Sequence, residues 1–409
     1  MQQSLISEEQ IAKLNTVSYL VGNEELFEEA LTTASLEPFD DEVLDFLNTL
    51  SKNLMMRKDA KLYPDIVTFG FWIRKSSMLR LKERFYKEDG DIHVGRGIAF
   101  HIAPSNVPVN YAYSLVAGMI TGNINIVRIP TKDFPQVSII NSAINETLQM
   151  FQNIKKYIFL VRYERNQQIN DIFSKVADTR IVWGGDNTIA ELRKSPLGAR
   201  AGEITFADRY SLAVIDSDKY LKIENKKRFA EEFYNDTYLT DQNACTSPRI
   251  VIWTGNENEK AKEAFWRELH ELVTAKYTLQ DIMGVNKLTS SYIFAATHNE
   301  VKIEPHEDNY IVRVSIGNPD DNIMEFKDNS GYFFEYDCKD ITEIAPLCNN
   351  THCQTIGYYG DMKDIIPLLK SGVRGIDRVV PVGKTMDFDL IWDGYNLYER
   401  LTRTIKITN

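Results

Sequence analysis

The chain contains 409 residues, of which 43% are hydrophobic and 26% charged, and its formal net charge is −11 at pH 7. This composition is ordinary for a soluble globular protein, and the length predicts a large core divided into two or more domains. The negative charge argues against nucleic acid or an anionic membrane as a standing partner, because either would favour a basic face.

Secretion or membrane insertion is not indicated. The first ten residues, MQQSLISEEQ, lack the basic and apolar regions of a signal peptide, and no window approaches the ~18 apolar residues of a spanning helix. Four cysteines in the whole chain argue against a disulfide scaffold. We therefore expect a cytoplasmic protein in a reducing compartment, without a membrane span.

Residues 1–90 are expected to be mostly helical. Ser7 to Gln10 have the spacing of a capping box ahead of an apolar periodic run. The segments 40–56 and 65–85 repeat apolar residues at intervals of three and four, as amphipathic helices do. We interpret these helices as structural covers.

Residues 91–207 show short apolar runs that alternate with helical stretches. This alternation predicts a parallel sheet with helices on its faces, and ligands of such sheets lie at the carboxyl ends of the strands. Three loops are therefore expected at one edge of the sheet: APSNVP at 103–108, RIPT at 128–131 and WGGDN at 183–187.

A second alternating region spans residues 208–383. Its strand-like runs are SLAVID, RIVIW, NYIVRV, GYFFEY, TIGYYG and RVVPVG. We place domain boundaries near Ala207–Asp208 and near Gly383. The remaining residues, 384–409, are expected to pack back onto the rest of the chain.

Cys245 lies in the segment DQNACTSPR, between a helical run and the apolar run IVIW, which predicts a turn. A thiol is a nucleophile only as thiolate, so a catalytic cysteine needs nearby positive charge and partial access. Arg249 follows four residues later, and the neighbouring Asn, Thr and Ser residues add no negative charge. A buried structural thiol is the alternative, and from the local pattern alone it is the commoner case.

The other three cysteines are better explained as structural residues. Cys338 lies on a strand-like run and is expected in the core. Cys348, His352 and Cys353, in LCNNTHCQ, could suggest zinc, but no second pair of ligands with a recognised spacing completes the site. We therefore expect no metal.

Residues of the three loops are candidates for ligand binding. Asn106 can cap the following helix or aim its side-chain N–H at an oxyanion. Gly184 and Gly185 precede a helix, whose N-terminus suits a phosphate, although two glycines also form ordinary turns. Arg128 ends a strand at the same edge and can hold a phosphate or a ribose, or remain solvated.

In this order, these segments resemble the aldehyde dehydrogenase superfamily. IAPSNVP looks like its Pro-Trp-Asn-Phe-Pro loop. GMITGNINIVR resembles its Ala-Gly-Asn-x-x-x-x-Lys strand, with Arg128 at the position of a lysine that contacts the cofactor. VWGGDNT is similar to its Thr-Gly-Ser-Thr cofactor loop, and DQNACTSPR to its catalytic cysteine segment.

Within this superfamily the chain resembles the LuxC-type acyl-CoA reductases, which include the fatty acid reductases of bacterial bioluminescence. The supporting stretches are VRIPTKDFP, DQNACTSPR and DRVVPVGKTMDFDLIWDGYNLYERLTR, and the resemblance covers most of residues 90–409. It implies an α/β fold of the aldehyde-dehydrogenase type, with the active site between a Rossmann-type cofactor domain and an α/β catalytic domain. The cofactor domain would comprise a helical part at 1–90 and a sheet at 91–207, the catalytic domain would be 208–383, and 384–409 would be the tail.

The resemblance implies NADPH-dependent reduction of an acyl thioester to an aldehyde. The Cys245 thiolate would attack the thioester of an acyl-CoA or an acyl-carrier and form an acyl-enzyme. The Asn106 side chain and the Cys245 backbone N–H would stabilise the oxyanion, and a nicotinamide cofactor would supply hydride. The positions implied to contact the cofactor are Pro104, Ser105, Arg128, Pro130, Gly184, Gly185 and Asp186.

Reduction is favoured over hydrolysis by the segment TFADR at 205–209. It aligns with the segment in which hydrolytic aldehyde dehydrogenases carry the glutamate that activates water, and Thr205 takes that position. Glu203 is two residues away, so a shift of register would restore a base. Arg128 in place of lysine offers a planar fork suited to the 2′-phosphate of NADPH, although the arginine alone does not decide against NADH.

Partners follow from the same resemblance. A fatty acyl substrate, an enzyme that activates or transfers acyl groups, and a homo-oligomer are implied. The competing hypotheses are an NAD(P)-dependent aldehyde dehydrogenase, an acyl-phosphate reductase, and a non-catalytic acyl-binding subunit that kept the fold.

Overall fold

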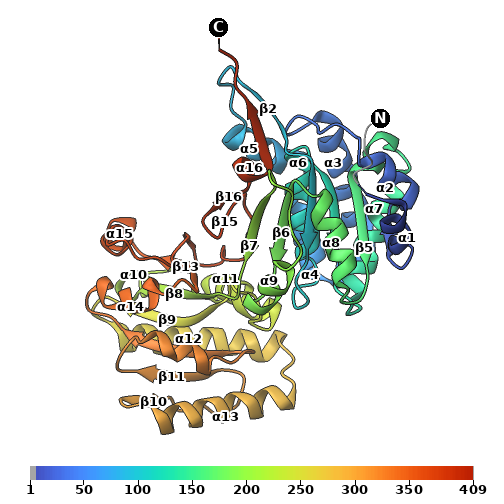
Figure 1. Cartoon of the computed structure of the whole chain (residues 1–409). Coiled ribbons are helices and arrows are strands. Elements are labelled where there is room, and N and C mark those ends of the chain that lie inside the picture. Colours follow the sequence, from blue (N-terminus) through green and yellow to red (C-terminus); the bar gives the residue numbers. More distant parts are fainter. Residues whose placement is uncertain (1–5, 409) are drawn as a thin grey trace. The chain divides into compact units, whose positions relative to one another are not determined.

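The computed structural model describes residues 6–408, which form two compact units (Figure 1). Unit 1 comprises residues 6–207 and 389–408, and unit 2 comprises residues 208–388. The second division falls at Phe388 and not at residue 383, because the Asp236 side chain holds the segment after β14 (Arg378–Pro381) within unit 2. The remainder of the tail belongs to unit 1.

The N-terminal part of unit 1 is mainly helical, as predicted. The capping box is confirmed: the Ser7 side chain accepts a hydrogen bond from the Gln10 N–H, and the Gln10 side chain accepts one from the Ser7 N–H. The sequence pattern does not indicate β1, a four-residue strand that pairs antiparallel with β5. The elements are α1 (Glu8–Leu14), β1 (Ser18–Val21), α2 (Glu24–Ala30), α3 (Asp41–Met56), η1 (Ala60–Leu62), α4 (Pro64–Trp72) and α5 (Lys75–Phe85).

The sheet of unit 1 has the strand order β1-β5-β4-β3-β6-β7, and every pair except β1 with β5 is parallel. The predicted parallel sheet is therefore present. Its strands are β3 (Ile98–Ile102), β4 (Ile124–Arg128), β5 (Ile158–Arg162), β6 (Thr179–Trp183) and β7 (Gly202–Phe206). Between them lie α6 (Asn110–Ile120), α7 (Pro135–Leu148), η2 (Gln152–Tyr157), α8 (Gln167–Val176) and α9 (Asp186–Leu192).

The end of the chain returns to unit 1. Strand β17 (Thr402–Ile405) pairs antiparallel with β2 (Ile92–Gly95), and Figure 1 shows this pair as a red strand beside a blue one. The short elements before it are β15 (Ile391–Trp392), β16 (Tyr395–Asn396) and α16 (Leu397–Leu401). The tail thus adds a strand pair that joins segments about 300 residues apart in sequence.

Unit 2 contains a sheet with the order β10-β11-β12-β9-β8-β13-β14, in which only β10 is antiparallel to its neighbour. The fold class is therefore α/β, as predicted. The strands not yet placed are β8 (Tyr210–Asp216), β9 (Pro248–Thr254), β10 (Val301–Ile303), β11 (Val312–Ile316), β12 (Tyr332–Asp337) and β13 (Cys353–Tyr359). The helical elements are α10 (Ser217–Tyr220), α11 (Lys226–Thr237), η3 (Tyr238–Thr240), α12 (Asn258–Lys276), α13 (Asp281–Thr297), η4 (Asp321–Phe326), η5 (Ile341–Ile344), α14 (Ala345–Asn349) and α15 (Met362–Lys370).

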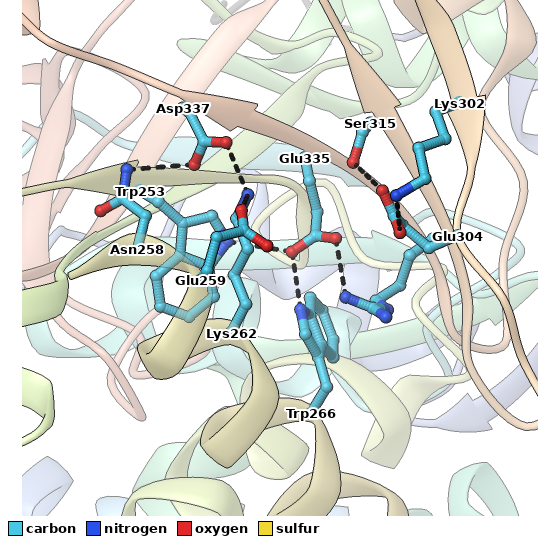
Figure 2. A network of polar contacts seen from close by, with 11 residues as sticks. Trp253, Asn258, Glu259, Lys262, Trp266, Lys302, Glu304, Ser315, Glu335 and Asp337 are labelled. Carbon is cyan, nitrogen blue, oxygen red and sulfur yellow. Dashed lines mark hydrogen bonds and ion pairs between the residues drawn. The ribbon is translucent and has the colours of Figure 1, made fainter.

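A buried carboxylate fastens α12 to the sheet of unit 2 (Figure 2). Glu335 on β12 is 1% exposed and accepts hydrogen bonds from the indoles of Trp253 (3.0 Å) and Trp266 (2.6 Å). Arg313 on β11 donates to its second oxygen at 3.1 Å. Burial raises the pKa of Glu335, and the Arg313 charge opposes this shift. Because each acceptor has a donor, the cluster is a satisfied structural cross-link.

Among residues 6–408, no helix is long and apolar enough to cross a membrane.

Candidate active site

The three candidate loops of unit 1 leave the sheet at one edge. Strand β3 lies between β4 and β6, and Ile102 at its carboxyl end pairs with Arg128 and Val182 in parallel register. The segment 103–108 therefore begins beside Arg128, and the segment 183–187 begins on the opposite side of β3, at the same edge of the sheet. This is the edge at which parallel α/β sheets bind ligands.

Asn106 is exposed and does not cap a helix. Helix α6 begins at Asn110, and its N-cap residue, Val109, makes no side-chain capping bond. Within residues 6–408 the Asn106 side chain has no hydrogen-bond partner, so the capping interpretation is wrong. Pro104 is half-buried and Ser105 is exposed in the same loop. The amide of Asn106 remains available to a ligand.

Arg128 ends β4 and is half-buried. Its guanidinium carbon lies 4.6 Å from the centroid of the Tyr163 ring, and Nη2 donates to the Tyr163 carbonyl at 3.3 Å. The buried Nε of Arg128 has no hydrogen-bond partner among the described residues, and Pro130 nearby in the chain is buried. A stacked guanidinium with an unmatched N–H is suited to an anionic oxygen as ligand.

The glycine loop follows β6 directly. The Gly184 N–H donates to the Phe206 carbonyl at 3.1 Å, and Gly185 is the N-cap of α9, with no atom within 4 Å of where its Cβ would be. The first residue of that helix, Asp186, is exposed. A carboxylate at this position suits a hydroxyl group of a ligand better than a phosphate, because the charges of phosphate and carboxylate repel.

Cys245 occupies a turn at the amino end of β9, as the sequence predicts. It is half-buried, whereas the other three cysteines are buried, and its carbonyl accepts a hydrogen bond from the Ser211 hydroxyl at 2.8 Å. Asp241 (φ 50°) and Gln242 (φ 59°), which open the turn, both have left-handed backbone conformations. Consecutive non-glycine residues in this region store strain, which is characteristic of functional turns.

The Gln242 side chain anchors this turn through four hydrogen bonds to backbone groups. Its side-chain oxygen accepts from the N–H groups of Gly331 (3.0 Å) and Tyr332 (3.2 Å). Its side-chain nitrogen donates to the carbonyls of Pro248 (2.9 Å) and Tyr332 (3.0 Å). With this side chain fully buried and all four bonds made, the left-handed backbone before Cys245 is fixed to β12.

Arg249 brings positive charge to the same turn. Its guanidinium, on a residue that is 6% exposed, donates to the Gln242 carbonyl, to the Asp328 carbonyl (2.6 Å) and to the Asn329 side-chain oxygen (2.6 Å). All three acceptors are neutral. Burial lowers the pKa of Arg249, and the negative charge of a Cys245 thiolate acts in the opposite direction. The two side chains are therefore close enough for the cation to stabilise the thiolate.

Asp236 fixes the segment that follows β14. Its buried carboxylate accepts from the N–H groups of Gly383 (2.6 Å) and Thr385 (3.0 Å). Burial raises the pKa of Asp236 to about 7, and these two bonds oppose the shift. The Thr246 hydroxyl contacts the sulfur of Met386 at 3.0 Å, so the segment lies beside the residue after Cys245. Sequence reasoning missed Asp236; the only signal was an acidic residue on the apolar face of α11.

Glu203 is an ion-paired residue. It lies on β7 with Thr205, and its carboxylate accepts hydrogen bonds from Nε of Arg180 (2.9 Å) and Nε of Arg193 (2.8 Å). Burial alone would raise the pKa of Glu203, but the bonds from Arg193 and Arg180 outweigh it and lower the pKa. A carboxylate held by two guanidinium groups is a poor general base.

Three buried cysteines lie in the core of unit 2. Cys338, Cys348 and Cys353 belong to one apolar cluster, whereas His352 is exposed. Burial raises the pKa of Cys338 to about 12. Within the part of the chain that the structure describes, no three His, Cys, Asp or Glu side chains are grouped as metal ligands. These thiols are structural in character.

Comparison with known sequences identifies relatives. A family model described as acyl-CoA reductase (LuxC) matches residues 74–404. A long-chain acyl-protein thioester reductase of Aliivibrio fischeri is 23% identical over 305 residues, which cover 72% of this chain and 60% of that protein. Its counterpart in Photorhabdus laumondii is 23% identical over 329 residues, covering 76% of this chain and 63% of that protein. The chain thus spans less than two thirds of the length of these relatives.

Comparison with solved structures identifies the fold. An NAD-dependent benzaldehyde dehydrogenase from Corynebacterium glutamicum superposes with a TM-score of 0.60 at 14% identity, covering 93% of this chain and 86% of that one. A lactaldehyde dehydrogenase from Escherichia coli superposes with a TM-score of 0.61 at 11% identity, covering 93% of this chain and 88% of that one. The chain therefore has the aldehyde-dehydrogenase-like fold that the sequence motifs predict.

Proposed function

The chain belongs to the LuxC family of acyl-CoA reductases, and on this premise we propose that it reduces an acyl thioester to an aldehyde through an acyl-enzyme on Cys245. The surroundings of Cys245 carry the proposal. Cys245 is the half-buried cysteine of the four, it lies in a strained turn, and the cation of Arg249 is close enough to stabilise its thiolate. A thiol in such an environment is suited to nucleophilic catalysis.

The first step is acyl transfer to the enzyme. The Cys245 thiolate attacks the carbonyl carbon of the thioester and forms a tetrahedral intermediate. The bond between this carbon and the sulfur of CoA or of a carrier then breaks, and the departing thiolate takes up a proton. The product is a thioester between the acyl group and Cys245.

The oxyanion of the intermediate requires N–H donors. We assign this role to the side-chain amide of Asn106 and the backbone N–H of Cys245. The assignment of Asn106 is supported by its exposed amide, which has no partner among the described residues. Donors of this kind stabilise the developing negative charge without reorganisation.

A nicotinamide cofactor, when bound, supplies the hydride that reduces the acyl-Cys245 thioester to the aldehyde and regenerates the thiolate. The residues of unit 1 fit such a group: the buried Nε of Arg128 has no described partner, and space is open above Gly185. The guanidinium of Arg128 favours NADPH, because its planar fork matches a 2′-phosphate. The residues proposed to hold the cofactor are Pro104, Ser105, Arg128, Pro130, Gly184, Gly185 and Asp186.

Hydrolysis of the acyl-enzyme is expected to be slow. Thr205 has no basic group, and both guanidinium groups bound to Glu203 stabilise its ionised form and occupy its lone pairs. Water therefore lacks a base to activate it, and the thioester persists until it is reduced.

The substrate is proposed to be a fatty acyl thioester. The relatives from Aliivibrio and Photorhabdus are named for long-chain acyl-protein thioesters, so a protein-bound acyl group is a donor to test beside acyl-CoA. An enzyme that activates or transfers acyl groups is the corresponding partner. We propose further that the enzyme acts in the cytoplasm as a homo-oligomer.

The decisive experiment separates acylation from reduction. The protein is incubated with acyl-CoA of several chain lengths, and its intact mass is measured before and after NADPH is added. We expect an acyl adduct on the wild type, its loss with consumption of reduced cofactor, and no adduct on Cys245→Ala. Cys353→Ala is the matched control, since Cys353 is a buried thiol of the same unit. A wild type without an adduct at any chain length would refute the proposal.

A further inference from the structure

Four buried polar side chains form a hydrogen-bonded cluster inside unit 1. His101 on β3 is 1% exposed, Ser114 on α6 is 3% exposed, and Asn125 on β4 is 0% exposed. The fourth is Trp183 at the end of β6, which is 7% exposed. His101 Nδ1 lies 2.7 Å from the Ser114 hydroxyl and its Nε2 lies 3.2 Å from the Asn125 oxygen, while Trp183 Nε1 lies 2.9 Å from the same hydroxyl.

The cluster allows one arrangement of protons. The Asn125 amide nitrogen donates to the carbonyls of Asn123 (2.7 Å) and Tyr157 (3.2 Å), so its oxygen faces His101 and must receive a proton from Nε2. The neutral imidazole then accepts at Nδ1. The Ser114 hydroxyl supplies that proton and accepts from the indole of Trp183, which can only donate. Every polar atom is satisfied with His101 as the neutral Nε2–H tautomer.

Three of the four members of the cluster each adjoin one segment of the proposed cofactor site. His101 precedes Pro104 by three residues, and Asn125 precedes Arg128 by three. Trp183 is followed directly by Gly184. The loop 103–109 runs from β3 to α6. The His101–Ser114 bond joins the strand before this loop to the helix after it.

The indole of Trp183 is fixed on a second side as well. Its ring stacks on Phe206 with centroids 3.7 Å apart, and the Phe206 carbonyl accepts the N–H of Gly184. The bond from Trp183 to Ser114 therefore links the glycine loop to α6. Moving one of the three segments would break a buried hydrogen bond to the other two, which is costly in an apolar interior.

A glycine makes room for the cluster. A Cβ on Gly118 would lie 1.8 Å from the Asn125 oxygen and 3.2 Å from His101 Nε2. A real side chain never tolerates such a contact with a rigid neighbour. Gly118→Ala is therefore a way to displace Asn125 without changing any residue of the cluster.

We propose that His101 is a positioning residue for the cofactor: as the centre of this cluster it holds the loop 103–109, Arg128 and the Gly184 loop in the geometry that binds the dinucleotide. The inference rests on the proposed function, since it takes the ligand of these segments to be a nicotinamide cofactor. His101 itself is buried and does not contact the ligand.

The test measures equilibrium binding of NADPH, by calorimetry and by the fluorescence of the reduced nicotinamide, in the full chain. His101→Phe removes both hydrogen bonds, and we expect the Kd to rise by about tenfold or more, because a tenfold change corresponds to the loss of about one buried hydrogen bond. His101→Asn keeps an acceptor for Ser114, and His101→Gln keeps a donor for Asn125. Each is expected to restore part of the affinity, and Gly118→Ala to weaken it as His101→Phe does.

Two controls distinguish positioning from general loss of structure. Tyr111→Phe removes a buried hydrogen bond of 2.7 Å to Asn141 from the same helix, outside the cluster, and is expected to leave the Kd within twofold of the wild type. Alkylation of Cys245 by iodoacetamide reports on unit 2 and is expected to be unchanged in the His101 variants.

The outcomes are separable. A folded His101→Phe with a Kd within twofold of the wild type would overturn the inference, and so would an equal loss of affinity in Tyr111→Phe. If His101→Phe does not fold, His101→Asn and Gly118→Ala replace it in the test. Kd values within twofold of the wild type in both of these variants would then overturn the inference. A wild type that binds neither NADPH nor NADH would overturn the proposed function and the inference with it.

Discussion

Acid should destabilise unit 1 through His101. Burial lowers the pKa of His101 to about 4, whereas an unfolded histidine has a pKa of about 6.5. Because the folded pKa is the lower one, the unfolded chain binds the proton first, and stability is lost as the pH falls from about 6.5 toward about 4. At pH 5 the pH is about 1.5 units below the pKa of the unfolded histidine. This difference corresponds to a loss of about 2 kcal/mol in the free energy of unfolding relative to pH 7.

Hydrogen exchange measured by mass spectrometry gives the local free energy of opening for peptides of β3 and α6. The partners of His101 in the cluster, Ser114, Asn125 and Trp183, do not titrate in this range, so the response belongs to His101. The wild type should lose about 2 kcal/mol more between pH 7 and pH 5 than His101→Gln, after correction for intrinsic exchange. If the free energy of opening depends equally on pH in both proteins, the assignment of His101 as a buried, neutral histidine is refuted.

Four further results are expected. Arg249→Met should slow alkylation of Cys245 at pH 7 about tenfold, because the thiolate loses a nearby cation, with partial recovery in Arg249→Lys; an unchanged rate would exclude the cation from thiolate stabilisation. Asp236→Ala leaves the N–H groups of Gly383 and Thr385 without an acceptor and should lower the free energy of unfolding by about 2–4 kcal/mol, measured in urea; a change below about 0.5 kcal/mol would contradict this. Arg128→Leu should raise KM for NADPH about tenfold and change KM for NADH little, and equal effects on both would count against a 2′-phosphate contact. Glu203→Gln should lower the melting temperature without slowing hydrolysis of the acyl-enzyme, followed by intact mass; slower hydrolysis would identify Glu203 as a base.

The α/β class and the two parallel sheets could be predicted because their strands are buried on both faces. Such strands appear as nearly continuous apolar runs, as β3 and β4 do, and the helices between them keep the interval regular. The turn at Cys245 and the common edge of the three loops follow from the same pattern.

Short strands, and strand pairs formed by segments far apart in sequence, could not be predicted from the apolar pattern. Strand β1 has four residues and no apolar periodicity that separates it from the helices around it. Strands β2 and β17 pair across most of the chain, and nothing local to either one indicates the other. Of the two roles open for Asn106, capping of the following helix is wrong because that helix begins at Asn110, and the residue types alone do not determine that boundary.

The sequence by itself determined which chemical groups the chain carries and in what order, including a cysteine before an apolar strand and the residues of three loops. Only the tertiary structure decided how these groups behave. His101, Asp236, Glu203 and Arg249 owe their protonation or charge state to burial and to partners that are mostly remote in sequence. The free energy of a charge depends on the solvent and dipoles around it, and folding alone brings these together.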